Sequence, residues 1–142
     1  MEFNFLDNSK LEVTSYSYDD FDIITKSFGY ELSNDLSLHN YFDWTRLKHW
    51  SFDFESYTES DLSNLFKKAE VVKERIVFFV RLLHHLPIVK VNSIALSEML
   101  DDLTHESGMG WEAISTCGKY ILEFTDGYEH MAKSNFKILE IG

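Results

Sequence analysis

Between Thr58 and Leu86, apolar residues recur at alternating steps of three and four. They are Leu62, Leu65, Ala69, Val72, Ile76, Phe79, Leu83 and Leu86. Because residues spaced in this way share one side of a helix, the pattern predicts a long helix that begins near Thr58 and ends before Pro87. Additional apolar residues at 66, 77, 78, 80 and 82 widen this face and indicate that its second half is buried on more than one side. We expect this helix to be central.

A second, shorter helix is predicted over 93–105. Its apolar face would consist of Leu96, Met99, Leu100 and Leu103. Asn92 or Ser93 can cap its start, and the glycines at 108 and 110 end it. The segment 88–91 between the two helices is expected to be an extended connector.

Alternating patterns predict strands elsewhere. In 52–55, phenylalanines alternate with Asp53 and Glu55, as in a half-buried strand, and a more polar alternation covers 11–18. Further strands are predicted over 111–116, 119–125 and 136–141, with a tight turn at Cys117-Gly118 between the first two.

Two segments leave alternatives open. Residues 21–28 fit a strand or a helix, and 36–50 has helix-like spacing at Leu38, Tyr41, Phe42 and Leu47. The prediction is an α+β fold in a single domain over 1–142. It consists mostly of antiparallel strands packed with one long and one or two shorter helices.

Size and composition favour a cytoplasmic domain. A chain of 142 residues with 44% hydrophobic residues can bury a core without metal or disulfide. The single Cys117 has no partner for an internal disulfide, which favours a reducing compartment. The start of the sequence lacks the pattern of a signal peptide, and the longest apolar run, 76–80, is too short to span a bilayer.

The charge is unevenly distributed. Acidic residues outnumber basic ones by 24 to 13, and residues 1–61 hold 13 of the acids with only 4 bases. A field of this sign repels nucleic acid and anionic membranes and attracts cationic proteins. Lys67, Lys68, Lys73, Arg75 and Arg81 would give the long helix a basic face, which we interpret as internal complementarity to the acidic flanks.

No motif names a reaction. The six histidines lack metal-ligand spacing, Cys117 has no neighbouring base, and Gly108-Met109-Gly110 follows a helix where a phosphate-binding loop would precede one. We therefore expect no catalytic residues, metal or cofactor. An enzyme that uses scattered residues remains an alternative, with His49, His84, Cys117 and Asp53 as candidates.

Aromatic rings stand next to carboxylates three times between positions 16 and 57. The candidate partner-binding residues are Tyr18, Asp19, Asp20, Asp22, Tyr41, Asp43, Trp44, Asp53, Glu55 and Tyr57. Tyr and Trp supply binding hot spots, and carboxylates select Arg- and Lys-rich partners. The rings at 18, 41, 44 and 57 fit a surface or a core position equally well.

In overall character, the chain resembles bacterial toxin-immunity proteins, of the contact-dependent growth inhibition or polymorphic toxin type. The residues that carry the resemblance are Asp19, Asp20, Asp22, Asp43, Asp53 and Glu55 with their neighbouring rings. The resemblance implies a monomer or weak homodimer that neutralises a cationic, nuclease-type toxin by tight binding. A homo-oligomeric adaptor, with Phe78, Phe79 and Val80 facing another copy, is the other alternative.

Overall fold

A computed structural model describes residues 11–33, 41–45, 47–54, 66–67, 75–82, 87–98, 110–125 and 134–139 of the chain. Within these residues, a seven-stranded antiparallel sheet has the order β1-β4-β3-β5-β6-β7-β2. The strands are β1 (Glu12–Val13), β2 (His49–Phe54), β3 (Val77–Arg81), β4 (Val89–Asn92), β5 (Gly110–Ser115), β6 (Ile121–Thr125) and β7 (Ser134–Leu139). The predicted α+β class is therefore confirmed at this level.

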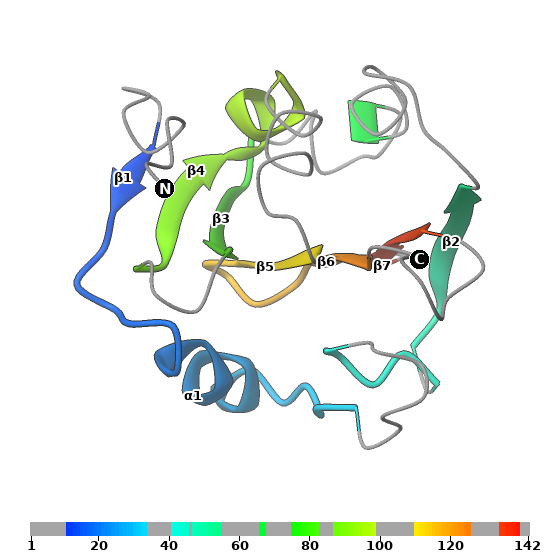
Figure 1. Cartoon of the computed structure of the whole chain (residues 1–142). Helices are drawn as coiled ribbons and strands as arrows, with labels where there is room; N and C mark the ends of the chain where they lie inside the picture. Colours follow the sequence, from blue (N-terminus) through cyan, green and yellow to red (C-terminus); the bar gives the residue numbers. More distant parts are fainter. Residues whose placement is uncertain are drawn as a thin grey trace.

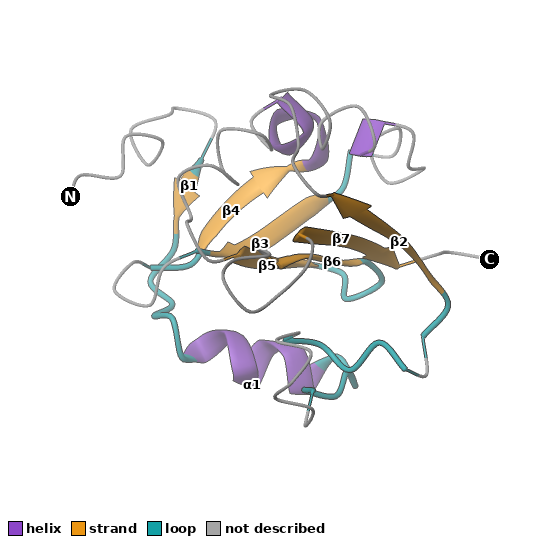
Figure 2. Ribbon diagram, turned by 45° about the vertical axis from the view of Figure 1, so that its right-hand side comes forward, coloured by secondary structure: helices purple, strands orange, loops and turns teal. Residues whose placement is uncertain are grey.

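Helical segments lie on the two opposite faces of the sheet (Figures 1 and 2). Helix α1 (Asp20–Ser27) covers one face, and the helical residues 93–98 lie on the other. The N-terminal part of the chain runs beneath the sheet, from β1 at one edge, through α1 and the 41–45 segment, to β2 at the opposite edge. Within the described residues, no helix is long and apolar enough to cross a membrane.

Strand predictions in the C-terminal third are confirmed. β5, β6 and the described part of 136–141 follow the predicted segments, and the turn between β5 and β6 falls at Cys117-Gly118 as expected. The strand predicted over 52–55 belongs to β2, which already begins at His49. Of the polar alternation over 11–18, only Glu12–Val13 forms a strand.

The single long helix predicted over 58–86 is wrong for residues 77–81, which form β3 between β4 and β5. β-Branched and aromatic side chains dominate this run and favour a strand, although their spacing also fits a helix. Arg75, with φ +55°, leaves the right-handed helical region just before the strand. Residues 66–67 are helical, 75, 76 and 82 beside the strand are not, and the rest of the predicted helix lies outside the described residues.

The structure also tests the predictions for the second helix, the extended connector and the two ambiguous segments. The second helix is confirmed over 93–98, where Asn92 caps it by accepting a hydrogen bond from the Ala95 amide (2.9 Å). The extended connector is β4, and the ambiguous 21–28 segment is largely helical. The helix-like spacing of 36–50 misleads for its described part, because the backbone of 41–43 pairs with that of 31–33 instead.

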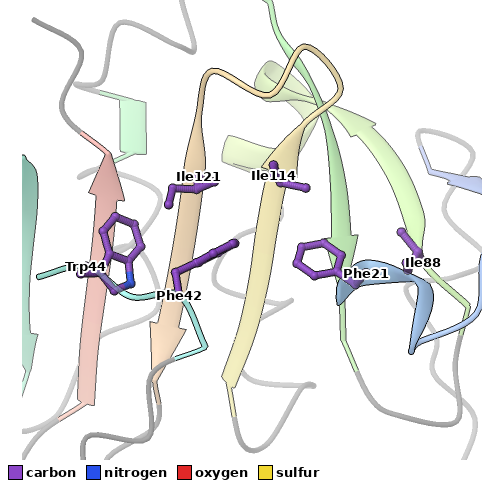
Figure 3. Packing of buried hydrophobic residues seen from close by; sticks show 6 residues of the cluster. All are labelled: Phe21, Phe42, Trp44, Ile88, Ile114 and Ile121. Atoms are coloured by element: carbon purple, nitrogen blue, oxygen red, sulfur yellow. The ribbon is translucent and has the colours of Figure 1, made fainter. Parts of the chain in front are cut away.

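A hydrophobic core fills the layer between α1 and the sheet (Figure 3). Its buried members are Phe21, Phe42, Trp44, Ile88, Ile114 and Ile121. On the other face of the sheet, the buried rings of Phe66 and Phe78 pack at a centroid distance of 6.4 Å. Since Phe78 and Val80 are buried within their own chain, the adaptor surface expected at 78–80 is not available to a second copy.

Gly29 and Gly110 both have positive φ, but of the two only Gly110 would also place a Cβ against neighbouring atoms. A comparison of alanine variants at these positions therefore distinguishes the cost of backbone strain from the cost of a steric clash. We expect Gly110→Ala to lower the free energy of unfolding by at least about 2 kcal/mol, because its Cβ would lie 2.5 Å from the Phe124 carbonyl oxygen. The matched control is Gly29→Ala, since Gly29 also has positive φ but a Cβ there meets nothing within 4 Å. It should cost only about 1 kcal/mol. Urea unfolding measures both, and equal losses would contradict the proposed contact.

Candidate functional site

Three ionisable residues form a row across the middle of the sheet, on the face that α1 covers. Arg81 of β3 is paired in register with Glu112 of β5, and Glu112 is paired in turn with Glu123 of β6. Arg81 and Glu123 are buried, and Arg81 Nε donates to Glu112 Oε2 at 3.1 Å. Buried ionisable groups are stable only when they are paired or hydrogen bonded. This row therefore determines which polar and aromatic groups of α1 and of the 41–45 segment can pack against the sheet.

Aromatic rings surround the Arg81 guanidinium. Its Cζ lies 4.2 Å from the ring centroid of Tyr41, 4.3 Å from that of Tyr18 and 5.0 Å from that of Phe21. Cation–π contacts of this kind stabilise a desolvated cation by roughly 2 kcal/mol. Burial disfavours the charged form, but the charge and hydrogen bond of Glu112, together with Tyr18 and Tyr41, hold the pKa of Arg81 above its ordinary value. Arg81 therefore connects β3 to α1 and to the 41–45 segment.

Asp22 completes the surroundings of Arg81 from the side of α1. Its Oδ1 accepts a hydrogen bond from the Tyr41 hydroxyl at 2.6 Å and lies 3.4 Å from the Arg81 guanidinium. Burial, together with the bond to Asp22, raises the pKa of Tyr41 well above its usual range. The side chain of Asp22 remains 44% exposed, so this carboxylate stands at the boundary between the interior and solvent.

Glu123 binds the 41–45 segment. Its carboxylate accepts hydrogen bonds from the amides of Tyr41 (2.6 Å) and Phe42 (3.1 Å) and from Nε1 of Trp44 (2.8 Å). Burial, reinforced by the charge of Glu112, raises the pKa of Glu123 to about 7, although the three donors oppose the shift. Burial likewise raises the pKa of Glu112, against the lowering effect of Arg81.

The structure brings four of the ten predicted partner-binding residues together around this buried row: Tyr18, Asp22, Tyr41 and Trp44. Trp44 is only 4% exposed, so its expected role as a surface contact needs correction: its ring belongs to the core and its N–H to Glu123. Tyr18 and Tyr41 stack on Arg81, which pairs with Asp22. Arg81 therefore has the acidic partner expected of it, but it lies in β3 and not on a basic helix face.

Of the other predicted residues, Asp20 and Asp43 form hydrogen bonds with neighbours in sequence that lie outside the buried row. Asp19 and Asp20 stand at the N-terminal end of α1, where Asp20 accepts a hydrogen bond from the Ser17 amide at 2.7 Å. Asp43 accepts hydrogen bonds from the amide and hydroxyl of Thr45. Asp53 lies in β2, and Glu55 and Tyr57 lie outside the described residues.

Sequence reasoning missed Glu112 and Glu123. Each is a lone carboxylate inside an otherwise apolar strand, in Trp111-Glu112-Ala113-Ile114 and Ile121-Leu122-Glu123-Phe124. A lone charge in a strand that is otherwise apolar on both faces is a signal of buried pairing, because charges are rarely buried alone. The same signal applies to Arg81, once its segment is recognised as a strand.

Of the four candidates for the enzyme alternative, His49 and Cys117 have side chains that the structure describes, and their surroundings are separate. His49 Nδ1 lies 2.7 Å from the Leu47 carbonyl oxygen, and its ring packs on Trp44. Burial opposes ionisation of Cys117, but hydrogen bonds from Ser115 and nearby backbone lower the pKa of this exposed thiol. His84 lies outside the described residues. Among the described residues, no three His, Cys, Asp or Glu side chains are placed to hold a metal ion.

Comparisons with known proteins do not place the chain in a family. No family model, no curated protein and no solved structure matches it. Its function must therefore be inferred from its own residues.

Removal of the Glu123 carboxylate should release the 41–45 segment. We expect Glu123→Leu to lower the free energy of unfolding by about 3 kcal/mol, because three buried N–H donors lose their acceptor. Glu123→Gln keeps one acceptor oxygen and should lose less. Urea unfolding followed by tryptophan fluorescence measures both, and wild-type stability of Glu123→Leu would contradict the role given to this carboxylate.

The raised pKa of Glu123 predicts a pH dependence. The ordinary value of 4.5 applies to the unfolded chain and about 7 to the folded one, so the folded state binds the proton more tightly. The stability from this group is complete below about pH 4.5 and is lost as the pH rises through about 7, by up to about 3 kcal/mol. Urea unfolding between about pH 5 and about pH 8 should show this decline in the wild type. In Glu123→Gln the decline should be smaller, and identical slopes would refute the assignment to Glu123.

Proposed function

We propose that this protein is an immunity-type inhibitor that binds and neutralises a cognate cationic toxin domain, of the nuclease class. The observation that carries the proposal is the charge of the segment from β1 to the end of the α1 region. Residues 11–33 contain five carboxylates and one lysine. Asp19 and Glu31 are exposed, and Asp22 is partly so. Such a surface attracts basic proteins and accelerates their association.

Arg81, the cation of the buried row, weakens this negative field only a little. Arg81 belongs to the basic middle part of the sequence, but its guanidinium is enclosed by rings and carboxylates between the sheet and α1. It therefore contributes little positive potential to the surrounding solvent. The carboxylates at the start of α1 are also favoured by the partial positive charge of the helix N-terminus, which stabilises them where they are.

The buried carboxylates also raise the possibility of an enzyme, since perturbed pKa values often accompany catalytic sites. Here each carboxylate has a structural task. The oxygens of Glu123 accept three hydrogen bonds from the 41–45 segment, and Glu112 pairs with Arg81. These interactions account for both groups without a substrate, so we favour the inhibitor.

Co-expression tests the proposed function. The chain is produced together with the C-terminal domain of the protein encoded by the neighbouring reading frame, which the proposal requires to be basic. We expect the two to copurify as a stoichiometric complex, and the chain to suppress the nuclease activity of the isolated domain. A neighbouring product that neither copurifies nor loses activity would refute the proposal.

A further inference from the structure

Exposed apolar side chains concentrate in one stretch of the chain. Among the described residues, the large hydrophobic side chains that are exposed are Val13 (53%), Tyr16 (43%), Ile23 (69%) and Phe28 (38%). All four lie between β1 and the residue after α1. Single exposed apolar residues are normal on a protein surface. Tyr16 packs edge-on against Phe79 at a centroid distance of 5.8 Å and the ring of Phe28 lies against Gly118, whereas Ile23 is the most exposed of the four.

Helix α1 presents Ile23 directly to solvent. Phe21 and Thr25 are fully buried against the sheet, and Ile24 packs on the same core. The outer face consists of Asp19, Ile23, Lys26 and Ser27, all of which are exposed. No fold requirement explains a β-branched apolar residue at the centre of this face, since it contributes little to the core and is a moderate helix former.

Carboxylates stand one helical turn before Ile23. Asp19 and Asp20 precede it by four and three residues, which places them next to it on the helix surface. Asp22 and Glu31 add negative charge nearby in sequence, and Lys26 is the only base of the segment. An apolar side chain bordered by carboxylates has the composition of a binding hot spot with a polar rim.

We propose that the outer face of α1 is the docking surface for a cationic protein, with Ile23 inserted in an apolar socket and Asp19 and Asp20 paired with Lys or Arg at its rim. This inference rests on the proposed function, because it takes the toxin domain as the partner. Charge complementarity selects that occupant over the others. A second copy would bring a like-charged face and a chain of net charge −11 against the same surface, and a nucleic acid would bring phosphates.

Matched variants test the surface. The probe is a catalytically inactive form of the basic C-terminal domain encoded by the neighbouring reading frame. We expect Ile23→Ala to raise its Kd about tenfold or more, mainly through faster dissociation. Asp19→Asn should slow association about twofold or more at low salt, and the difference should disappear at high salt. Both positions are exposed, so thermal unfolding should remain close to that of the wild type.

Glu98→Gln supplies the control, because it removes the same charge from an exposed residue of the helical segment 93–98, and this segment lies on the opposite side of the sheet (Figure 2). Its affinity for the basic domain should equal that of the wild type. If the wild type binds but Ile23→Ala and Asp19→Asn bind equally well, the docking surface is wrong and the proposed function stands. If the wild type does not bind, both fail. A homodimer that Ile23→Ala dissociates in sedimentation would identify a second copy as the occupant and overturn the inference.

Discussion

The fold depends on hydrogen bonds and ion pairs made by side chains of the central strands. Glu123 accepts hydrogen bonds from the backbone of the 41–45 segment. Arg81 contacts the ring of Tyr18 and pairs with the carboxylate of Asp22 in α1. Residues 41–45 lie outside the sheet and are not helical, so those amides that do not pair with 31–33 need another acceptor. A buried carboxylate supplies it, since a buried amide without a partner costs about 1–3 kcal/mol.

Such a solution carries a desolvation cost that an apolar core would avoid. Replacement of a buried ion pair by hydrophobic residues is often neutral or stabilising, so the pair contributes little to net stability. These polar groups instead specify which segments pack against the sheet. Glu123 requires N–H donors, and Arg81 requires carboxylates and aromatic rings. The position of the 41–45 segment is thus specified by polar contacts, while Phe42 and Trp44 supply the buried area.

Sequence patterns predicted the fold class and the C-terminal strands, because period-two alternation and turn glycines are local signals. They failed at 77–81, where β-branched and aromatic residues also fell at helical spacing and the neighbouring strands decided the outcome. For the candidate site, rings beside carboxylates predicted Tyr18, Asp22 and Tyr41 as partner-binding residues, whereas the structure places all three around Arg81 of the same chain. The sequence pattern could not indicate that Arg81 would occupy the space between these residues, because that contact joins positions about sixty apart in sequence.

The path of the N-terminal third has a consequence for the order of assembly. β1 pairs with β4, and β2 pairs with β7, so this part of the chain finds its neighbours near both edges of a sheet made largely from later residues. During synthesis, the strands within residues 12–54 are made before the strands with which they pair, and the ladder between His49 and Leu139 can close only after residue 139 has been added. Such distant pairings slow folding, because the chain loses the entropy of closing a long loop before the stabilising contacts form. During that delay, the density of carboxylates in the nascent segment gives it charge repulsion that opposes premature aggregation.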